Sequence, residues 1–400
     1  MRTILLTLLL TSFLFPVSAR HAGEGTAWWH GKKRELRYRP DGEDFVIVNG
    51  ERRFTRALYG TNTAFRVETG DRPEFAFYMP GMGGNVRLGL LAGGKSLWLD
   101  KAEYVESRYR PGARLYTVKD PAMGPKGKID LYVLALGRGE GLILRAVSSG
   151  LPAGTELVWS YGGASGARLS RNGDMNADPE SSFYLLPEYC VENRLEIRGE
   201  TFALRFGNKR DTFEMSGRFP EGSRLWRGDA RRLSTPAEAC GVADGRDFPV
   251  LIGRKNFGGN DTLFLCLYNT GTRRIDRYAE LPEVFREAET HRRAVAGRIR
   301  IDTPDPYLNA MGGALAVAAD AIWESPSYLH GAIGWRVQLP GWRGAYAGDF
   351  LGWHDRAREH FTAYAASQRI NMPDKPVIMD TVLNLARTAK IPGTPMYSSG

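Results

Sequence analysis

The sequence is poor in cysteine and histidine, with 3 and 6 of them among 400 residues. Cys190, Cys240 and Cys266 are too few and too far apart for a CxxC metal site or a disulfide framework. We therefore expect no metal and no cofactor. Cys266 lies in the apolar run 263–267 and should be a buried strand residue, whereas Cys190 and Cys240 could pair in an exported chain.

Several enzyme motifs are also missing. The chain has no Gly-x-Ser-x-Gly and no His-Glu-x-x-His. The glycines of segment 81–85 lack the Lys-Ser/Thr of a phosphate loop and the third glycine of a dinucleotide fingerprint, so we read them as a turn.

Runs of basic residues are absent although the net charge is +9. The densest stretch, 292–300, lies among glutamates, with Glu289 four residues before Arg293, which is typical of a solvated helix face. Nucleic-acid binding is therefore not expected.

A single long apolar run occurs, at residues 4–15, after a positive start at Arg2. It ends in a small-x-small pattern at Val17-Ser18-Ala19, so residues 1–19 read as a secretory signal peptide. The run is shorter than the ~20 residues that a membrane helix needs. We predict a secreted or periplasmic chain with no membrane span.

Residues 20–278 are expected to form a β-sandwich domain. Segments 194–198 and 202–206 alternate apolar and polar residues around Gly199-Glu200, and 131–136 with 142–147 flank a glycine-rich turn. Both patterns predict antiparallel hairpins. Further strands are expected at 45–48, 97–99, 115–118, 156–161 and 262–268.

The apolar period changes after residue 276. A linker helix is expected within 279–300, between Pro282 and Gly297, and two more helices at 306–323 and 350–367. Strands followed by helices indicate two segregated domains, with the junction near residue 300 and the second domain at 301–400.

The segment between those two helices holds four of the nine tryptophans, at 323, 335, 342 and 353. Their rings could stack on the C–H faces of sugars while nearby charged side chains meet the hydroxyls. The candidate sugar contacts are Trp335, Trp342, Arg343, His330, Trp353 and His354. The tryptophans could instead pack the helices on the sandwich, and the histidines could be structural.

Thr303-Pro304-Asp305-Pro306, the Trp-rich loop and Gly348-Asp349 resemble the opening of an (α/α)6 six-hairpin glycosidase barrel, as in α-L-rhamnosidase-like enzymes. Segments 58–66, 70–75 and 83–85 resemble uncharacterised exported proteins of polysaccharide-utilising Bacteroidetes. The resemblance implies a β-sandwich followed by an (α/α)6 toroid, here incomplete, and a glycoside hydrolase-like protein acting on polysaccharide-derived oligosaccharides.

The resemblance also implies inverting hydrolysis by two carboxyl groups, for which Asp349, Glu324 and Asp355 are the candidates. Asp349 could equally be a helix N-cap, and Asp355 could form a solvated pair with Arg356. The competing function is a non-catalytic carbohydrate-binding or surface-assembly protein.

A toroid needs more helices than about a hundred residues can supply. We therefore expect the chain alone to be inactive and the apolar helix face of Leu308, Met311 and Leu315 to lack partners, so that another chain could dock there.

Overall fold

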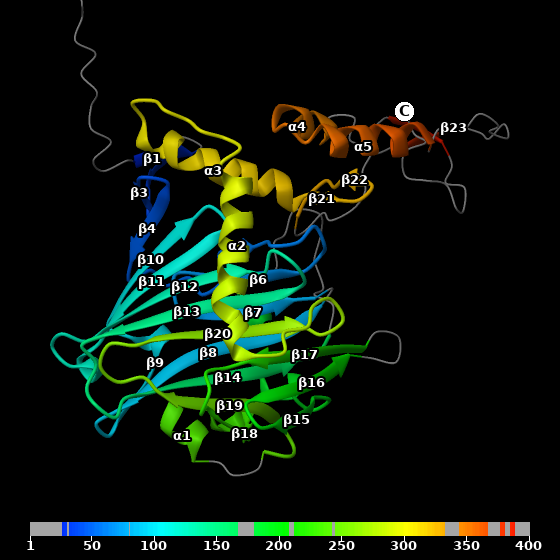
Figure 1. Cartoon of the computed structure of the whole chain (residues 1–400). Coiled ribbons are helices and arrows are strands. Elements are labelled where there is room, and N and C mark those ends of the chain that lie inside the picture. The colour runs from blue at the N-terminus through cyan, green and yellow to red at the C-terminus, as the bar shows by residue number, and fades with distance from the viewer. Residues whose placement is uncertain are drawn as a thin grey trace, which may run out of the picture.

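The computed structural model describes residues 26–388, except 30–31, 80, 167–179, 208–211, 242–244, 333–343, 367–376 and 381–384. Two large antiparallel sheets make up most of the described chain, with helices along one side and at one end (Figure 1). A short hairpin of β1 (Thr26–Trp29) and β2 (Lys32–Glu35) precedes them.

The larger sheet has ten strands, in the order β15-β16-β17-β20-β13-β12-β11-β10-β4-β3. Their bounds are β3 Arg39–Asp41, β4 Asp44–Val48, β10 Tyr104–Arg110, β11 Ala113–Lys119, β12 Lys128–Ala135, β13 Gly141–Ser149, β15 Arg194–Arg198, β16 Thr201–Gly207, β17 Thr212–Arg218 and β20 Thr262–Asn269. Both hairpins expected from the sequence are confirmed, as β12–β13 and β15–β16.

The smaller sheet has eight strands, in the order β18-β19-β14-β8-β7-β6-β5, with β9 also paired to β8. Their bounds are β5 Arg56–Leu58, β6 Arg66–Thr69, β7 Glu74–Tyr78, β8 Met82–Ala92, β9 Lys95–Trp98, β14 Glu156–Ala164, β18 Arg224–Asp229 and β19 Pro249–Asn256. A short helix, α1 (Pro236–Cys240), follows β18.

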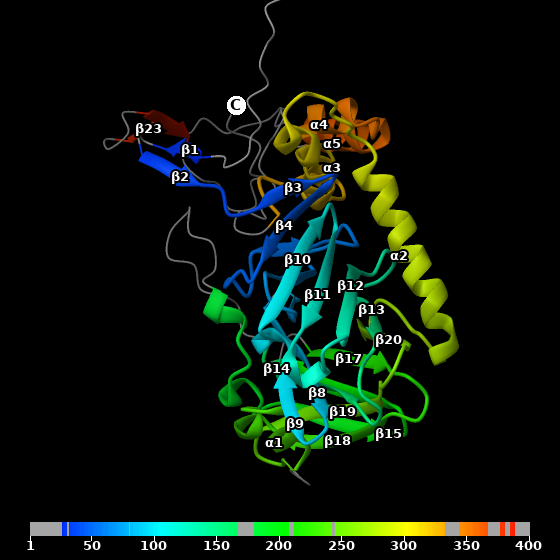
Figure 2. The ribbon, with the colours of Figure 1, turned by 90° about the vertical axis from the view of Figure 1, so that its left-hand side faces the viewer.

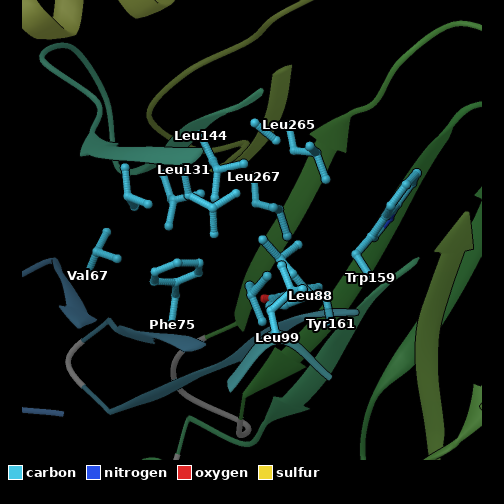
Figure 3. Packing of buried hydrophobic residues seen from close by; sticks show 14 of the residues in the cluster. Val67, Phe75, Leu88, Leu99, Leu131, Leu144, Trp159, Tyr161, Leu265 and Leu267 are labelled. Carbon is cyan, nitrogen blue, oxygen red and sulfur yellow. The ribbon is translucent and has the colours of Figure 1, made fainter. Parts of the chain in front are cut away.

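The main core lies between the two sheets (Figure 3). Alternate residues of β12 are buried, which brings Leu131 against Phe75 and Val67 of the other sheet. Trp159 stacks on Phe219 with ring centroids 4.9 Å apart. Each such buried side chain stabilises the fold by about 1.5–3 kcal/mol, so this core is the main reason the sheets stay together.

Helix α2 (Leu281–Ala296) packs on the outer face of the ten-stranded sheet (Figure 2). Phe285 meets the edges of Tyr132 and Phe264, with ring centroids 5.3 and 5.7 Å away. The helix expected here is therefore confirmed between Pro282 and Gly297, and one of its faces belongs to a second core on the sheet.

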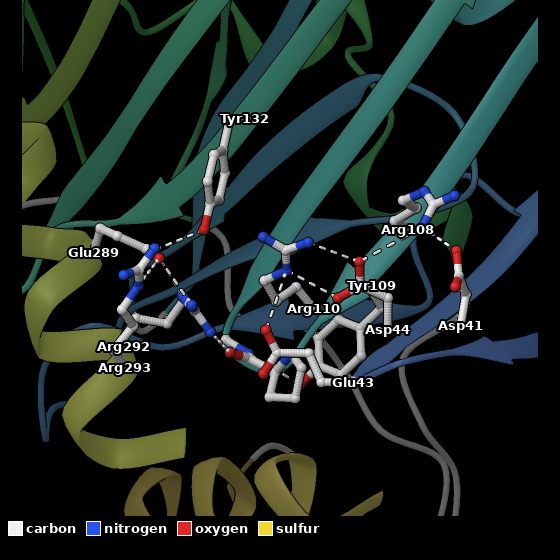
Figure 4. Close-up of polar contacts among 12 residues, drawn as sticks. Asp41, Glu43, Asp44, Arg108, Tyr109, Arg110, Tyr132, Glu289, Arg292 and Arg293 are labelled. Atoms are coloured by element: carbon white, nitrogen blue, oxygen red, sulfur yellow. Dashed lines mark hydrogen bonds and ion pairs between the residues drawn. The ribbon is translucent and has the colours of Figure 1, made fainter. Parts of the chain in front are cut away.

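Polar contacts hold the C-terminal half of α2 to the sheet (Figure 4). The Glu289 carboxylate accepts hydrogen bonds from Tyr132 Oη (2.6 Å), Arg292 Nε (2.7 Å) and Arg293 Nε (2.6 Å). Despite partial burial, these donors lower the pKa of Glu289 to about 2. Arg292 Nη1 also donates to the Pro111 carbonyl at 2.8 Å.

The expected helical toroid is wrong. Residues 301–400 show α3 (Pro306–Ala321), α4 (Gly344–Phe350) and α5 (His354–Ala366). The described part of the chain holds five α-helices, and they are not arranged as a toroid. Two hairpins also lie in this region: β21 (Trp323–Glu324) with β22 (Ser327–Tyr328), and β23 (Val377–Asp380) with β24 (Leu385–Thr388).

The two helices expected in this region are present. The helix expected at 306–323 is confirmed as α3, and the one expected at 350–367 is confirmed as α5, which begins at His354 because the chain turns at Gly352, whose φ of +72° favours glycine. The hairpin β21–β22 directly follows α3.

Three smaller expectations have mixed outcomes. Residues 82–85, read as part of a turn, are the start of β8, where Gly84 packs against the Tyr161 ring. Cys266 is buried in β20 as expected, and Cys190 and Cys240 are both free thiols. Leu308, Met311 and Leu315 are exposed on α3, while docking of another chain there stays a prediction.

Candidate functional site

The sequence-predicted site residues are spread along the helical end of the molecule. Trp335, Trp342 and Arg343 lie outside the described residues. His330 is exposed just after β22, and Glu324 is half-buried in β21. The other candidates gather where α4 ends and α5 begins.

Asp349 and His354 form a pair at this junction. Asp349 lies in α4, half-exposed, and its Oδ1 is 3.2 Å from His354 Nδ1 at the start of α5. Trp353 lies between them in the sequence and is half-buried. Its backbone NH donates a hydrogen bond to the Gly348 carbonyl at 2.7 Å, which holds it in place. Asp349 is therefore near the end of a helix and bonds an imidazole, and it is not an N-cap.

Aromatic residues lie close to this pair along the chain. Tyr346 and Phe350, four residues apart on α4, are 47% and 91% exposed. The guanidinium carbons of Arg356 and Arg298 lie 4.5 and 5.5 Å from the Trp353 ring centroid. Because residues three and four apart share a helix face, Asp349 lies on the same side of α4 as Tyr346. We call Tyr346, Asp349, Phe350, Trp353 and His354 the helical-end surface.

Asp355 differs from this group. Its side chain is 96% exposed and pairs with Arg358 at 3.2 Å. Arg356, which could have paired with Asp355, instead turns inward to the nearly buried Asp320, with Nη1 2.7 Å from Oδ1. Asn62, from the loop after β5, donates through Nδ2 to the Asp320 carbonyl at 3.0 Å.

Tyr328 lies beside this ion pair. Its ring centroid is 4.9 Å from that of Trp323, and its backbone NH donates to His360 Nδ1 at 3.0 Å. Burial, reinforced by the charges of Asp320 and Asp349, raises the pKa of Tyr328 to about 12 against the opposing effect of Arg356. Tyr328 is therefore a neutral phenol at pH 7.

Sequence reasoning did not assign the Asp320–Arg356–Asn62 group. Asn62 and Arg356 are 294 residues apart, and only the fold brings them together. The one available signal was Asp320 within the otherwise apolar α3, where a carboxylate needs a partner.

The described residues contain no group of three or more His, Cys, Asp or Glu side chains placed to hold a metal ion. Within the same part of the chain, no helix is long and apolar enough to cross a membrane. The helical-end surface offers three aromatic rings, one carboxylate and one imidazole, with the guanidinium groups of Arg298 and Arg356 beside Trp353.

The fold defines a protein of two large packed antiparallel sheets with a helical end. Residues 79–289 match the family described as a domain of unknown function, DUF4450, and the chain belongs to that family. A comparison with curated proteins finds no match.

Among solved structures, the chain is similar to glycoside hydrolases. A bacterial glucoamylase complexed with acarbose matches with 10% identity over 80% of this chain and 53% of that one, at a TM-score of 0.46. A family GH92 glycosyl hydrolase matches with 12% identity over 72% and 41%, at 0.37. A GH92 α-mannosidase from Bacteroides thetaiotaomicron matches with 8% identity over 72% and 38%, at 0.25. The chain spans about half or less of these structures.

Proposed function

We propose that this protein binds polysaccharide-derived oligosaccharides outside the cytoplasm, through the helical-end surface. The observation that carries the proposal is the Asp349–His354 pair, with the exposed rings of Tyr346 and Phe350 on the same helix as Asp349. Aromatic faces take the C–H side of a sugar ring, and the carboxylate and imidazole can hydrogen-bond its hydroxyls. The signal-peptide pattern at residues 1–19 supports export to the periplasm or beyond.

Exposure of Phe350 strengthens the case for a ligand surface. A phenylalanine that is 91% exposed contributes almost nothing to the core, and it lies next to Tyr346, itself 47% exposed. Clusters of exposed aromatic rings with polar neighbours mark binding sites more often than scattered apolar residues do.

Binding is better supported than hydrolysis. An inverting hydrolase needs one carboxyl group kept protonated and a second facing it across the sugar. Asp349 is bonded to His354, and Asp355 projects into solvent with Arg358. Glycoside hydrolysis, with Glu324 as a third candidate carboxylate, remains the alternative.

The test compares single variants by isothermal titration with a panel of neutral oligosaccharides. Phe350→Ala should weaken binding by about 2- to 10-fold, equivalent to 0.5–1.5 kcal/mol of stacking. Asp349→Asn should weaken it as well. Leu308→Ala on α3 is the matched control, because it removes another exposed apolar side chain.

Leu308→Ala should bind like the wild type, and all variants should keep the wild-type melting temperature. Unchanged binding by Phe350→Ala and Asp349→Asn, or an equal loss in Leu308→Ala, would show that the helical-end surface is not the site.

A further inference from the structure

A second hollow lies on the sandwich, away from the helical end. It is on the outer face of the ten-stranded sheet, at its β15–β16–β17 edge. Figure 1 shows the strands of this edge, beyond those that α2 covers. Its volume is about 470 Å³, within the range of about 300–1,000 Å³ that is usual for small-ligand sites. We call it the sheet groove.

Small side chains form the floor of the sheet groove. In the strand register Ala203 pairs with Glu196 on one side and Ser216 on the other, while Thr201 pairs with Arg198. Side chains of residues directly opposite each other point to the same face of a sheet. The short Thr201, Ala203 and Ser216 side chains therefore leave a hollow between longer charged neighbours, floored partly by hydroxyl groups.

The charged walls are mainly arginine. Five arginines and two glutamates line the groove, and two more carboxylates, Glu287 and Asp276, pair with Arg273 and Arg274 from outside the lining, which leaves a net charge of one positive. Arg205 is held by both glutamates, with Nε 2.6 Å from Glu214 Oε2 and Nη1 2.9 Å from Glu196 Oε1. Arg198 and Arg274, on the rim, have side chains 82% and 85% exposed.

Arg218 is the arginine whose charge is least compensated. Its guanidinium donates to three uncharged oxygens: the Asp276 carbonyl at 3.1 Å, the Gly217 carbonyl at 3.1 Å and Thr201 Oγ1. Among the described residues, no carboxylate forms an ion pair with it. These three bonds fix the guanidinium at the groove while its charge remains available to a ligand.

The chemistry of such a site favours an anionic sugar. With Nε and Nη1 of Arg218 engaged, its Nη2 still has two hydrogens to donate to a carboxylate or sulfate, and hydrogen bonds between charged groups are the strong ones. The floor hydroxyls already donate to the Gly217 and Phe202 carbonyls, so sugar hydroxyls would be bound mainly by the two glutamates, which accept hydrogen bonds. The same glutamates would repel the closely spaced phosphates of a nucleic acid. The groove therefore fits a short ligand with isolated negative charges and many hydroxyls.

We propose that the sheet groove binds acidic oligosaccharides, those bearing uronate carboxylates or sulfate esters, with Arg218 as the main anion contact. The proposal takes from the proposed function only that the ligand is a glycan. It adds a second site, on a different element, with a different charge preference.

The experiment titrates the full chain with trigalacturonate, a sulfated disaccharide and neutral maltotriose at low and high salt. The wild type should bind at least one acidic probe about tenfold more tightly than maltotriose, and high salt should weaken that binding. Preference for the uronate or for the sulfate identifies the anionic group. Equal affinity for the neutral sugar, or no binding of either acidic probe, would overturn the proposal.

Variants locate the acidic ligand. Arg218→Gln should weaken acidic binding by about tenfold, because a hydrogen bond between charged groups is lost, and Arg218→Lys should restore part of it. Arg224→Gln, an exposed arginine on β18, is the matched control and should have no effect. Phe350→Ala should also leave acidic binding intact. If Phe350→Ala abolishes it, or Arg224→Gln and Arg218→Gln lose it equally, the groove is not the site.

Discussion

A single buried carboxylate links the sandwich to the helical end. Asp320 is 5% exposed and lies in the last turn of α3. Its carboxylate pairs with Arg356 of α5, and its backbone carbonyl accepts a hydrogen bond from Asn62 in the loop after β5. Removing one partner from a buried ion pair leaves the other charge uncompensated. The position of α5 on the sandwich therefore depends on this contact.

Asp320→Asn should lower the free energy of unfolding by about 3 kcal/mol, because it leaves Arg356 charged and poorly paired. Urea denaturation followed by tryptophan fluorescence measures the change. Asp355→Asn is the control at a 96% exposed position, where a change within about 0.5 kcal/mol is expected. Similar effects of the two substitutions would mean that the Asp320–Arg356 pair contributes no more than a surface pair does.

At the level of elements, the strands and the helices α2, α3 and α5 could be predicted, whereas α4, the β21–β22 hairpin and the arrangement of the helical end could not. Segments 194–198 and 202–206 show a period of two that directly reflects one buried face, so β15 and β16 appear nearly where expected. The apolar face of α2 is equally regular. The β21–β22 hairpin consists of two-residue strands, too short to show any period.

The candidate site was predictable only in part. Asp349, Trp353 and His354 are close in sequence, so a local pattern could place them together. Asn62 and Asp320 meet through the packing of a sandwich loop against α3, which no local pattern encodes. The charge of the sheet groove likewise depends on strands and loops from separate parts of the chain.

The docking of α2 should depend on pH through Glu289. Its pKa in the folded state is lowered to about 2 from an ordinary 4.5, so its contribution is complete above about pH 5 and is lost as pH falls toward 2. Glu289→Gln should cost on the order of 2 kcal/mol at pH 7, allowing for solvent screening, and should flatten the fall in stability between pH 5 and 2.

Chemical denaturation at several pH values checks this prediction. Glu283→Gln, on an exposed position of the same helix, is the control and should keep the wild-type pH dependence. If Glu289→Gln retains the full wild-type slope below pH 5, the contacts of Glu289 with Tyr132, Arg292 and Arg293 do not stabilise the folded state.

At the scale of the whole molecule, the sheets dominate and the helices are accessory. The expectation of a toroid came from a local likeness at 303–306 and 348–349. Motifs this short can precede many different arrangements of helices, so they did not determine the arrangement here. The main cluster of buried apolar residues lies between the sheets, and a second joins α2 to the outer face of the larger sheet. The described residues of the helical end belong to neither cluster and pack only against the edge of the main one.

This distribution leads to the last prediction, that the chain binds glycans without cleaving them. Inverting hydrolysis requires two carboxyl groups that face each other across the sugar. Asp349 is bonded to His354, and Asp355 is 96% exposed and paired with Arg358, so each of these carboxylates already has a partner on its own side. Incubation with rhamnosyl, glucuronyl and arabinosyl oligosaccharides should release no reducing sugar. Hydrolysis by the wild type that is lost in Asp349→Asn but kept in Asp355→Asn would show instead that Asp349 is a catalytic residue and that binding is a step of turnover.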